Sequence, residues 1–196
     1  MDNNKTLLEW LQRPIIAVVR HSGELDAALL SPCSIIELRA SSLIDLPQIV
    51  QRCRQARKAL FIYPELLDGL GHGPAAIEFL VQYARPAGIV STKKQILNTA
   101  AEFGLVTVFQ IFMIDTQAFG TGVRNAQKVA CDAIEIMPGA IPNIVNEVCR
   151  LVERPVLCAG LVKTEGEVDA LLAAGARGIA TSSTSLWTHQ ANRTPI

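Results

Sequence analysis

The sequence carries no excess charge of either sign. Its 196 residues hold 18 Lys and Arg against 18 Asp and Glu, so the formal net charge at pH 7 is zero. Charged residues make up only 18% of the chain and hydrophobic residues 49%, the composition of a compact globular protein. Bulk electrostatics therefore gives no support to nucleic-acid binding, which a basic protein would favour.

Motifs of metal, redox and nucleotide sites are also absent. The five cysteines, an odd number, have no C-x-x-C spacing, and we interpret most as small buried residues in a reducing compartment. Cys158 is predicted to face the inside of the sheet to which its strand belongs, which is the lumen of the barrel predicted below. The sequence shows no partner base for it, so we interpret Cys158 as a buried core residue. The three histidines are isolated, so no metal site is predicted, and neither a P-loop nor G-x-S-x-G occurs.

Long apolar runs are missing as well. Behind the N-terminal Met-Asp-Asn-Asn-Lys no run is long enough for a signal peptide, and no segment reaches the ~20 apolar residues that span a bilayer. We expect a cytoplasmic soluble protein with no membrane partner; no oligomeric state follows from the sequence.

What the chain has is a repeating pattern. Eight apolar runs, each closed by a polar or turn residue, alternate with segments of helical periodicity through short links. This alternation predicts a parallel sheet, and eight repeats predict closure into a compact TIM-like (β/α)8 barrel. We expect residues 1–196 to form a single domain whose first dozen residues are a short helix or arm. The runs are Ile15–Arg20, Ser34–Arg39, Leu60–Glu65, Gly88–Thr92, Val106–Asp115, Ala133–Met137, Pro155–Val162 and Gly178–Ser183.

Strand alternation predicts which polar side chains face the barrel lumen. In Ala133-Ile-Glu-Ile-Met the isoleucines face the helices, so Glu135 points inward, and the same logic places Glu37 and Arg39 in the lumen. The pattern is weaker for Tyr63, Glu65 and Gln110. Buried ionised groups need partners, which leaves two interpretations: a self-satisfied ion-pair network, or a polar ligand cavity. For the cluster as a whole we favour the cavity.

The last third of the chain contains two apolar strands that each end in Gly, Thr or Ser where a helix begins. Gly160 closes one, and Thr181 and Ser182 close the other. Unpaired N–H groups at such turns suit a phosphate, and the seventh and eighth crossovers are where barrels bind it. Lys93, Lys94 and Lys163 lie near predicted helix starts, where they either accompany an anionic ligand or point into solvent.

The densest basic segment is Arg52–Lys58. Its cations are either the solvated face of a helix or a contact for RNA or another acidic partner through Arg54, Arg57 and Lys58.

Taken together, several strings resemble the glycerol-3-phosphate responsive antiterminator family. They are Arg13-Pro-Ile-Ile-Ala-Val-Val-Arg, Arg85-Pro-Ala-Gly-Ile-Val-Ser-Thr-Lys, Phe112-Met-Ile-Asp-Thr, Ile134-Glu-Ile-Met-Pro-Gly-Ala-Ile-Pro, Ala159-Gly-Leu-Val-Lys-Thr-Glu and Thr181-Ser-Ser-Thr-Ser-Leu-Trp, in order from Arg13 to Trp187. The resemblance implies a TIM-like barrel that binds glycerol 3-phosphate and no other cofactor. It also implies action on leader mRNA as a transcription antiterminator of glycerol-utilisation genes, rather than catalysis.

The resemblance also implies particular site residues. The phosphate-end residues of the family fall on Gly160, Thr181 and Ser182, its Pro-Gly on Pro138-Gly139, and its Ser-Thr-Lys on Ser91-Thr92-Lys93. With the lumen residues, the predicted ligand set is Gly160, Thr181, Ser182, Lys93, Glu135, Gly139, Glu65 and Arg20.

Three positions depart from the family pattern. Tyr63-Pro64-Glu65 replaces a His-Val-Asp string, Ala159-Gly160 replaces Gly-Gly, and Phe109-Gln110 replaces a Gln-Arg pair. The last change removes a lumen cation, and Gln cannot supply its charge-assisted fork. The resemblance therefore implies a divergent member, and we expect its ligand recognition to be weakened or redirected.

The alternative is a barrel enzyme. Pro14-Ile-Ile-Ala-Val-Val-Arg and Ile35-Ile-Glu-Leu-Arg also resemble the 2-keto-3-deoxy-6-phosphogluconate aldolases. Those enzymes need a Schiff-base lysine where this chain has Glu135, so that mechanism is excluded at this position. An enzyme acting on a phosphorylated sugar or sugar acid, with Glu135 or Glu65 as general base, remains as the competing hypothesis.

Overall fold

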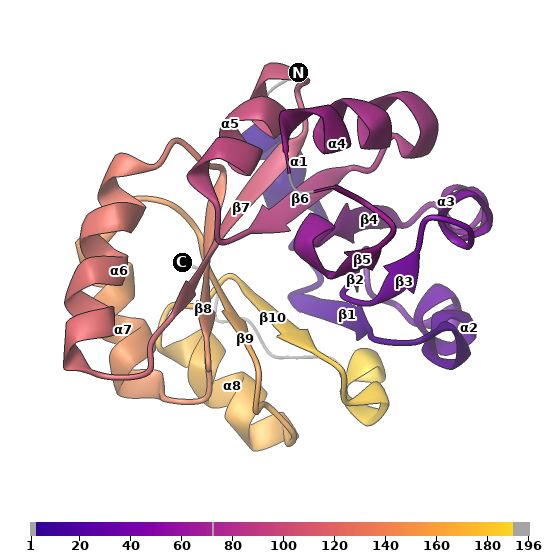
Figure 1. Cartoon of the computed structure of the whole chain (residues 1–196). Coiled ribbons are helices and arrows are strands. Elements are labelled where there is room, and N and C mark those ends of the chain that lie inside the picture. The colour runs from indigo at the N-terminus through magenta and orange to yellow at the C-terminus, as the bar shows by residue number, and fades with distance from the viewer. Residues whose placement is uncertain (1–2, 72, 190–196) are drawn as a thin grey trace.

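Eight parallel strands close into a barrel in the computed structural model, which describes residues 3–71 and 73–189. Around the barrel the order is β1-β10-β9-β8-β7-β6-β4-β2, and helices surround it (Figure 1). This confirms the predicted TIM-like fold; residues 1–2, 72 and 190–196 of the predicted single domain lie outside the description. The strands are β1 (Ile15–Val19), β2 (Ile35–Leu38), β4 (Ala59–Ile62), β6 (Gly88–Ser91), β7 (Val106–Phe112), β8 (Ala133–Met137), β9 (Val156–Ala159) and β10 (Gly178–Thr181).

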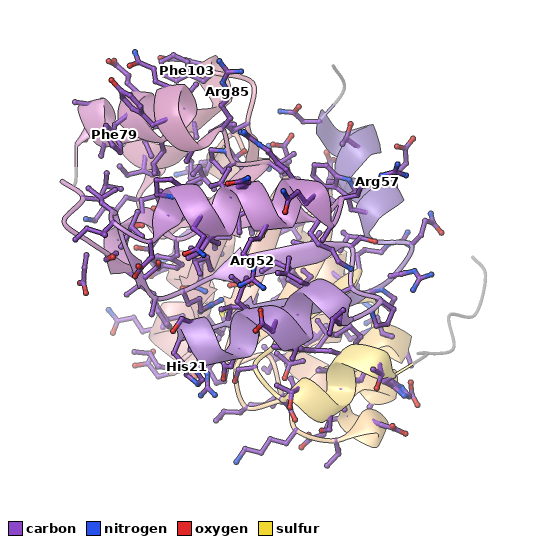
Figure 2. The ribbon with its side chains drawn as sticks, turned by 90° about the vertical axis from the view of Figure 1, so that its right-hand side faces the viewer. His21, Arg52, Arg57, Phe79, Arg85 and Phe103 are labelled. Atoms are coloured by element: carbon purple, nitrogen blue, oxygen red, sulfur yellow. The ribbon has the colours of Figure 1, made fainter. Side chains whose placement is uncertain are left out.

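The crossovers are short amphipathic helices. In α3 (Leu46–Gln55) the buried residues Leu46, Ile49, Val50 and Cys53 recur at helical spacing. Arg52, labelled in Figure 2, lies outside this stripe and pairs with Asp26 of the neighbouring helix. After β10, only the 3-10 segment η3 (Thr184–Thr188) is found within the described residues. The other helices are α2 (Ser22–Leu30), α4 (Pro74–Phe79) with its π-helical continuation η2 (Leu80–Ala84), α5 (Lys94–Glu102), α6 (Thr116–Lys128), α7 (Pro142–Leu151) and α8 (Glu165–Ala173). In the described ranges, none is long and apolar enough to cross a membrane.

The strands divide their side chains between two apolar clusters. Residues such as Ile134 and Ile136 pack between barrel and helices, whereas Ala133 and its alternating neighbours pack in the lumen. Cys158 belongs to the outer cluster, so the prediction that it faces the lumen was wrong. The apolar run through β9 is buried on both faces, and pattern alone could not set its register.

Helix α1 (Asn3–Trp10) closes the N-terminal end of the barrel. Leu7 and Leu11 belong to the lumen cluster, and Trp10 meets Phe61 edge-on with ring centroids 5.9 Å apart. The side chain of Asn3 donates a hydrogen bond to the Leu105 carbonyl at 3.1 Å. Because apolar side chains fill this end, polar lumen residues can meet a ligand only from the C-terminal end.

A small feature at the C-terminal end was not predicted. Strand β3 (Ser41–Ser42) pairs in parallel with β5 (Leu67–Asp68), which follows the 3-10 turn η1 (Pro64–Leu66). Two-residue strands leave no periodic signal in a sequence. They join the loops that follow β2 and β4.

We expect Leu11→Ala to lower the free energy of unfolding by about 2–5 kcal/mol, because it empties a fully buried lumen position. Leu8→Ala in α1, the helix that ends just before Leu11, is the matched control, since Leu8 is 38% exposed and should change stability by less than about 1 kcal/mol. Urea unfolding measures both. Equal losses would show that α1 does not plug the barrel.

Candidate functional site

A cavity of about 530 Å³ opens where the C-terminal ends of β1, β2, β8, β9 and β10 meet. Arg20, Gly160, Thr181 and Ser182 of the predicted ligand set line it together. Two further cations, Arg39 and Lys163, also line it, and its lining within the described residues includes no carboxylate. Such a cavity favours an anion.

The turn after β9 exposes backbone N–H groups through an unusual conformation. Gly160 has φ +79°, and Leu161 follows with φ +65°, a value that costs a residue with a Cβ. Within the described residues, no hydrogen bond from the N–H groups of Leu161 and Val162 is found, whereas the β9–β10 register turns the Gly160 N–H toward Ala180 of β10. A Cβ at Gly160 would lie 3.2 Å from Met137 Cγ, so the turn also brings the chain close to β8.

The start of α8 itself is already satisfied. Thr164 and Glu167 form a capping box, and Glu167 Oε2 accepts from the N–H groups of Lys163 at 2.8 Å and Thr164 at 2.9 Å. These two hydrogen bonds lower the pKa of the exposed Glu167 carboxyl. The free donors thus lie in the turn before the helix, rather than at the helix start that the sequence indicated.

Thr181 joins the two turns. Its hydroxyl donates to the Val162 carbonyl at 3.0 Å and accepts from the Ser183 N–H at 3.1 Å, and the Trp187 indole donates to its carbonyl at 2.8 Å. With its side chain so occupied and only 4% exposed, Thr181 positions the turns. Ser182, half-buried beside it, keeps its N–H without a partner among the described residues.

Below this cavity, Arg39 lies between two buried carboxylates. Its Nε is 2.7 Å from Glu37 Oε1, and its Nη2 donates to Glu135 Oε1 at 2.7 Å. Gln110 Nε2 donates to the same Glu135 oxygen, and the guanidinium lies 5.7 Å from the centre of the Tyr63 ring. Both glutamates are 1% exposed, as strand alternation predicted. Gln110 thus shares the Glu135 oxygen with Arg39, the residue that follows β2.

The cluster is incompletely satisfied. Glu135 Oε2 has no hydrogen-bond partner within the described residues, and the contact of Arg39 Nε with Glu37 Oε1 is an ion pair without hydrogen-bond alignment. Glu135 lies two residues before Met137, which lines the cavity, so the cluster forms the next lumen layer below it. Buried polar groups that lack partners are a mark of functional sites.

One cation cannot neutralise two carboxylates. Burial raises the pKa of Glu37 to about 8, with the Glu135 charge adding to the effect and Arg39 opposing it. Burial works against the charge of Arg39, yet the two glutamates raise its pKa above the ordinary value. With Glu37 neutral, the cluster pairs one cation with one anion.

The remaining predicted ligand residues lie outside the cavity. Glu65 follows β4 in η1, where Oε1 accepts from the Ser91 hydroxyl and Oε2 is buried without a partner in the described chain. Ser91 also accepts from the Lys93 N–H, and the Lys93 side chain is exposed. Burial, and then the Glu65 charge, raise the pKa of nearby Tyr63 to about 12. These residues form a second polar group on the opposite side of the barrel mouth.

Gly139 has a packing role. Its N–H donates to the Ala159 carbonyl at 2.7 Å, and a Cβ would lie 2.6 Å from Cys158 Cβ. Glycine here is needed for close contact with β9. The residues predicted to contact RNA, Arg54, Arg57 and Lys58, lie at the opposite end of the barrel.

Arg39 is the site residue that sequence reasoning left out of the ligand set. Its signal was present, because alternation along β2 placed it in the lumen. The sequence could not tell which of the charged lumen side chains lines the cavity, because that depends on how side chains from five strands pack together.

Arg20 and Glu24 form the cavity's outer ion pair. Burial would raise the pKa of Glu24, but hydrogen bonds from the Arg20 N–H at 2.7 Å and Nη2 at 2.8 Å lower it below the ordinary value. Arg20 is half-exposed, so it is free to turn toward a ligand.

The family model of the glycerol-3-phosphate responsive antiterminator matches residues 15–187, which include every strand of the barrel. The chain belongs to this family. The predicted resemblance is thereby confirmed.

Relatives of this antiterminator family member include proteins with solved structures. A glycerol uptake operon antiterminator regulatory protein from Listeria monocytogenes is 28% identical, with 89% of this chain and 95% of that chain covered and a TM-score of 0.85. A glycerol uptake operon antiterminator-related protein from Thermotoga maritima is 28% identical, with 88% of this chain and 96% of that chain covered and a TM-score of 0.78. Protein YgcP of Escherichia coli, described as uncharacterised, is 29% identical over 90% of this chain and 93% of its own. Aldolases and an epimerase at 10% to 13% identity share the fold alone.

We expect the antiterminator to lose stability as pH rises from about 4.3, the ordinary glutamate value, to about 8. The folded state keeps Glu37 protonated in this range, whereas the unfolded chain releases the proton and gains from doing so. Glu37→Gln should remove this decline, so its stability relative to the parent rises by on the order of a few kcal/mol over that range.

Urea unfolding between about pH 5 and about pH 9 measures the effect. Glu102→Gln on the exposed side of α5 is the control and should follow the parent at every pH. Parallel curves for Glu37→Gln and the parent would show that Glu37 is ionised in the folded protein.

Proposed function

We propose that this antiterminator family member is a regulatory protein that senses glycerol 3-phosphate in the cavity at the C-terminal end of the barrel. One observation carries the proposal. Three cations and the unpaired N–H groups of two turns converge on a cavity whose inner end is a polar cluster with unsatisfied oxygens. A phosphate suits the turns, and hydroxyl groups suit the cluster.

The phosphate end rests on backbone geometry. N–H groups at Leu161, Val162 and Ser182 act as fixed dipoles that need no side-chain ordering. Lys163 and Arg20 add charge at the rim, where solvent screens it in part. Thr181 keeps both turns in register through its hydrogen bond to Val162.

The glycerol end rests on the Arg39 cluster. Glu135 Oε2 can accept a hydrogen bond, and Arg39 Nη1 has only a 4.0 Å contact with Met137 Sδ. A hydroxyl both donates and accepts, so it satisfies such a mixture. An anionic group would gain nothing from a cluster in which Arg39 and Glu135 already balance each other.

For the output we propose transcription antitermination on the leader mRNA of glycerol-utilisation genes. The support is the family membership and the two antiterminator structures at 28% identity. A protein that acts on a nascent transcript works in the cytoplasm, so we infer that location as well. The effector then serves as a signal rather than a substrate, with no further cofactor.

A barrel enzyme is the second candidate. The observation in its favour is that two buried carboxyl groups, Glu37 and Glu135, share Arg39 below the cavity, and that burial raises the pKa of Glu37 to about 8. Glu135 could then serve as a general base. Solvent-deuterium exchange into the carbon-bound hydrogens next to the carbonyl of a phosphorylated sugar, followed by mass spectrometry, tests it; incorporation that Glu135→Gln abolishes would favour the enzyme.

We expect glycerol 3-phosphate at about 100 times its Kd to raise the melting temperature by roughly 5–10 °C, because only the folded form binds it. Gly160→Ala should remove the shift, since a Cβ is strained at φ +79° and approaches Met137. Gly166→Ala is the matched control in the first turn of α8, where a Cβ would meet nothing within 4 Å. A shift retained in Gly160→Ala would place the phosphate elsewhere.

We further expect glycerol 3-phosphate to bind at least about tenfold more tightly than 3-phosphoglycerate, whose carboxylate meets the balanced Arg39 cluster. Glu135→Gln should narrow that preference, since it leaves Arg39 with a surplus positive charge. Glu65→Gln, outside the cavity, should leave the ratio as it is. Isothermal titration calorimetry gives both affinities, and a ratio insensitive to Glu135→Gln would contradict this orientation of the ligand.

A further inference from the structure

A second cationic cavity lies at the N-terminal end of the barrel, where α1, α3, η2 and the start of β4 meet. Its volume is about 260 Å³, and we call it the basic pocket. The residues that define it are Trp10, Arg54, Arg57, Lys58 and Arg85. Within the described residues its lining contains no carboxylate, and none of its four cations takes part in an ion pair.

Two of the cations are held in place by backbone carbonyls. Arg54 Nη2 donates to the Ala84 carbonyl at 2.9 Å, which ties α3 to the end of η2. Lys58 Nζ donates to the carbonyls of Ser31 at 2.6 Å and Cys33 at 2.8 Å. Burial lowers the pKa of Lys58. These contacts use donors of Arg54 and Lys58 but cancel neither positive charge.

The other two cations sit on strained backbone. Arg57, just after α3, has φ +55°, and Arg85, which ends η2, has φ +48°. Such positions after a helical segment ordinarily hold glycine, because a Cβ is unfavourable there. Both arginines are exposed and lie on the α3 side of the molecule (Figure 2). Two strained arginines lining one pocket point to function rather than to folding.

The chemistry of the pocket fits the backbone of an unpaired RNA strand. Guanidinium groups bind phosphate through two parallel hydrogen bonds, and uncompensated cations gain by releasing counterions from a polyanion. The half-buried indole of Trp10, seated edge-on against Phe61, adds an aromatic surface of the kind on which RNA bases stack. The chain has no net charge, so a local pocket has to supply the attraction.

We propose that the basic pocket is the RNA contact of this protein, with Arg57 and Arg85 on the phosphates and Arg54 and Lys58 as anchored supporting charges. The proposal rests on the proposed function, because that function supplies RNA as the partner. The pocket lies at the opposite barrel end from the effector cavity, so RNA and glycerol 3-phosphate can be bound at the same time.

The test is fluorescence anisotropy of the full chain with a fluorescein-labelled hairpin RNA that ends in an unpaired uridine tail, with saturating glycerol 3-phosphate. At low salt we expect the double variant Arg57→Gln/Arg85→Gln to raise Kd at least about tenfold. It should also reduce the slope of log Kd against log salt by roughly 1.4, the value for two single-strand phosphate contacts. Arg124→Gln/Lys128→Gln on exposed α6 is the control of equal charge change, and its Kd should stay within about twofold of the parent.

A further variant removes loss of folding as an explanation. Arg57→Gly relieves the left-handed backbone, so its melting temperature should match or exceed that of the parent while RNA binding still weakens. An RNA affinity unchanged in the Arg57→Gln/Arg85→Gln variant would overturn the proposal that the basic pocket contacts RNA. The proposal of effector sensing would still stand in that case if glycerol 3-phosphate raises the melting temperature of the protein. Failure of the parent itself to bind RNA would overturn both this inference and the antitermination role. Arginine-dependent binding to phosphatidylserine vesicles without RNA binding would overturn it in favour of a membrane contact.

Discussion

The contact on which the C-terminal end of this barrel depends is that of the Arg39 guanidinium with Glu37 and Glu135. Two carboxylates deep in a closed lumen are tolerable only when a cation and a retained proton divide their charge. The same guanidinium lines the cavity above, so one side chain both balances the buried carboxylates and faces the cavity. Any effector that satisfies the remaining oxygens of this cluster is thereby coupled to the stability of the barrel.

The two ends of the barrel differ in what fills them. At the C-terminal end, Gly160 and Thr181 fix the conformation of the turns that carry backbone N–H donors. At the N-terminal end, Leu7 of α1 and Leu11 just after it fill the lumen. The cations at the two ends also differ in their partners. At the C-terminal cavity Arg20 and Arg39 form ion pairs with carboxylates, whereas the cations of the basic pocket form none within the described chain. A protein with zero net charge thus has two cavities lined by cations, and the two differ in chemistry.

Sequence reasoning predicted the repeating strands and the lumen positions well, because both follow from a two-residue period within each strand. It placed Arg20, Gly160, Thr181 and Ser182 in what is one cavity. It also gathered Glu65, Lys93 and Gly139 into the same set, although these residues lie elsewhere at the barrel mouth or serve packing. The lumen face of Cys158 was wrong, since β9 is apolar on both sides and its register has no polar marker.

The sequence by itself determined the (β/α)8 architecture, the inward direction of Glu37, Arg39 and Glu135, and the glycine-bearing turns at the last two crossovers. These are local properties of hydrophobic period and backbone freedom. Only the tertiary structure decided that Arg39 joins the cavity, that the hydroxyl of Thr181 ties the two turns together, and that Arg85 shares a pocket with Arg57. Such pairings join residues far apart in the chain that meet only in the folded barrel, and no local pattern encodes which side chains meet.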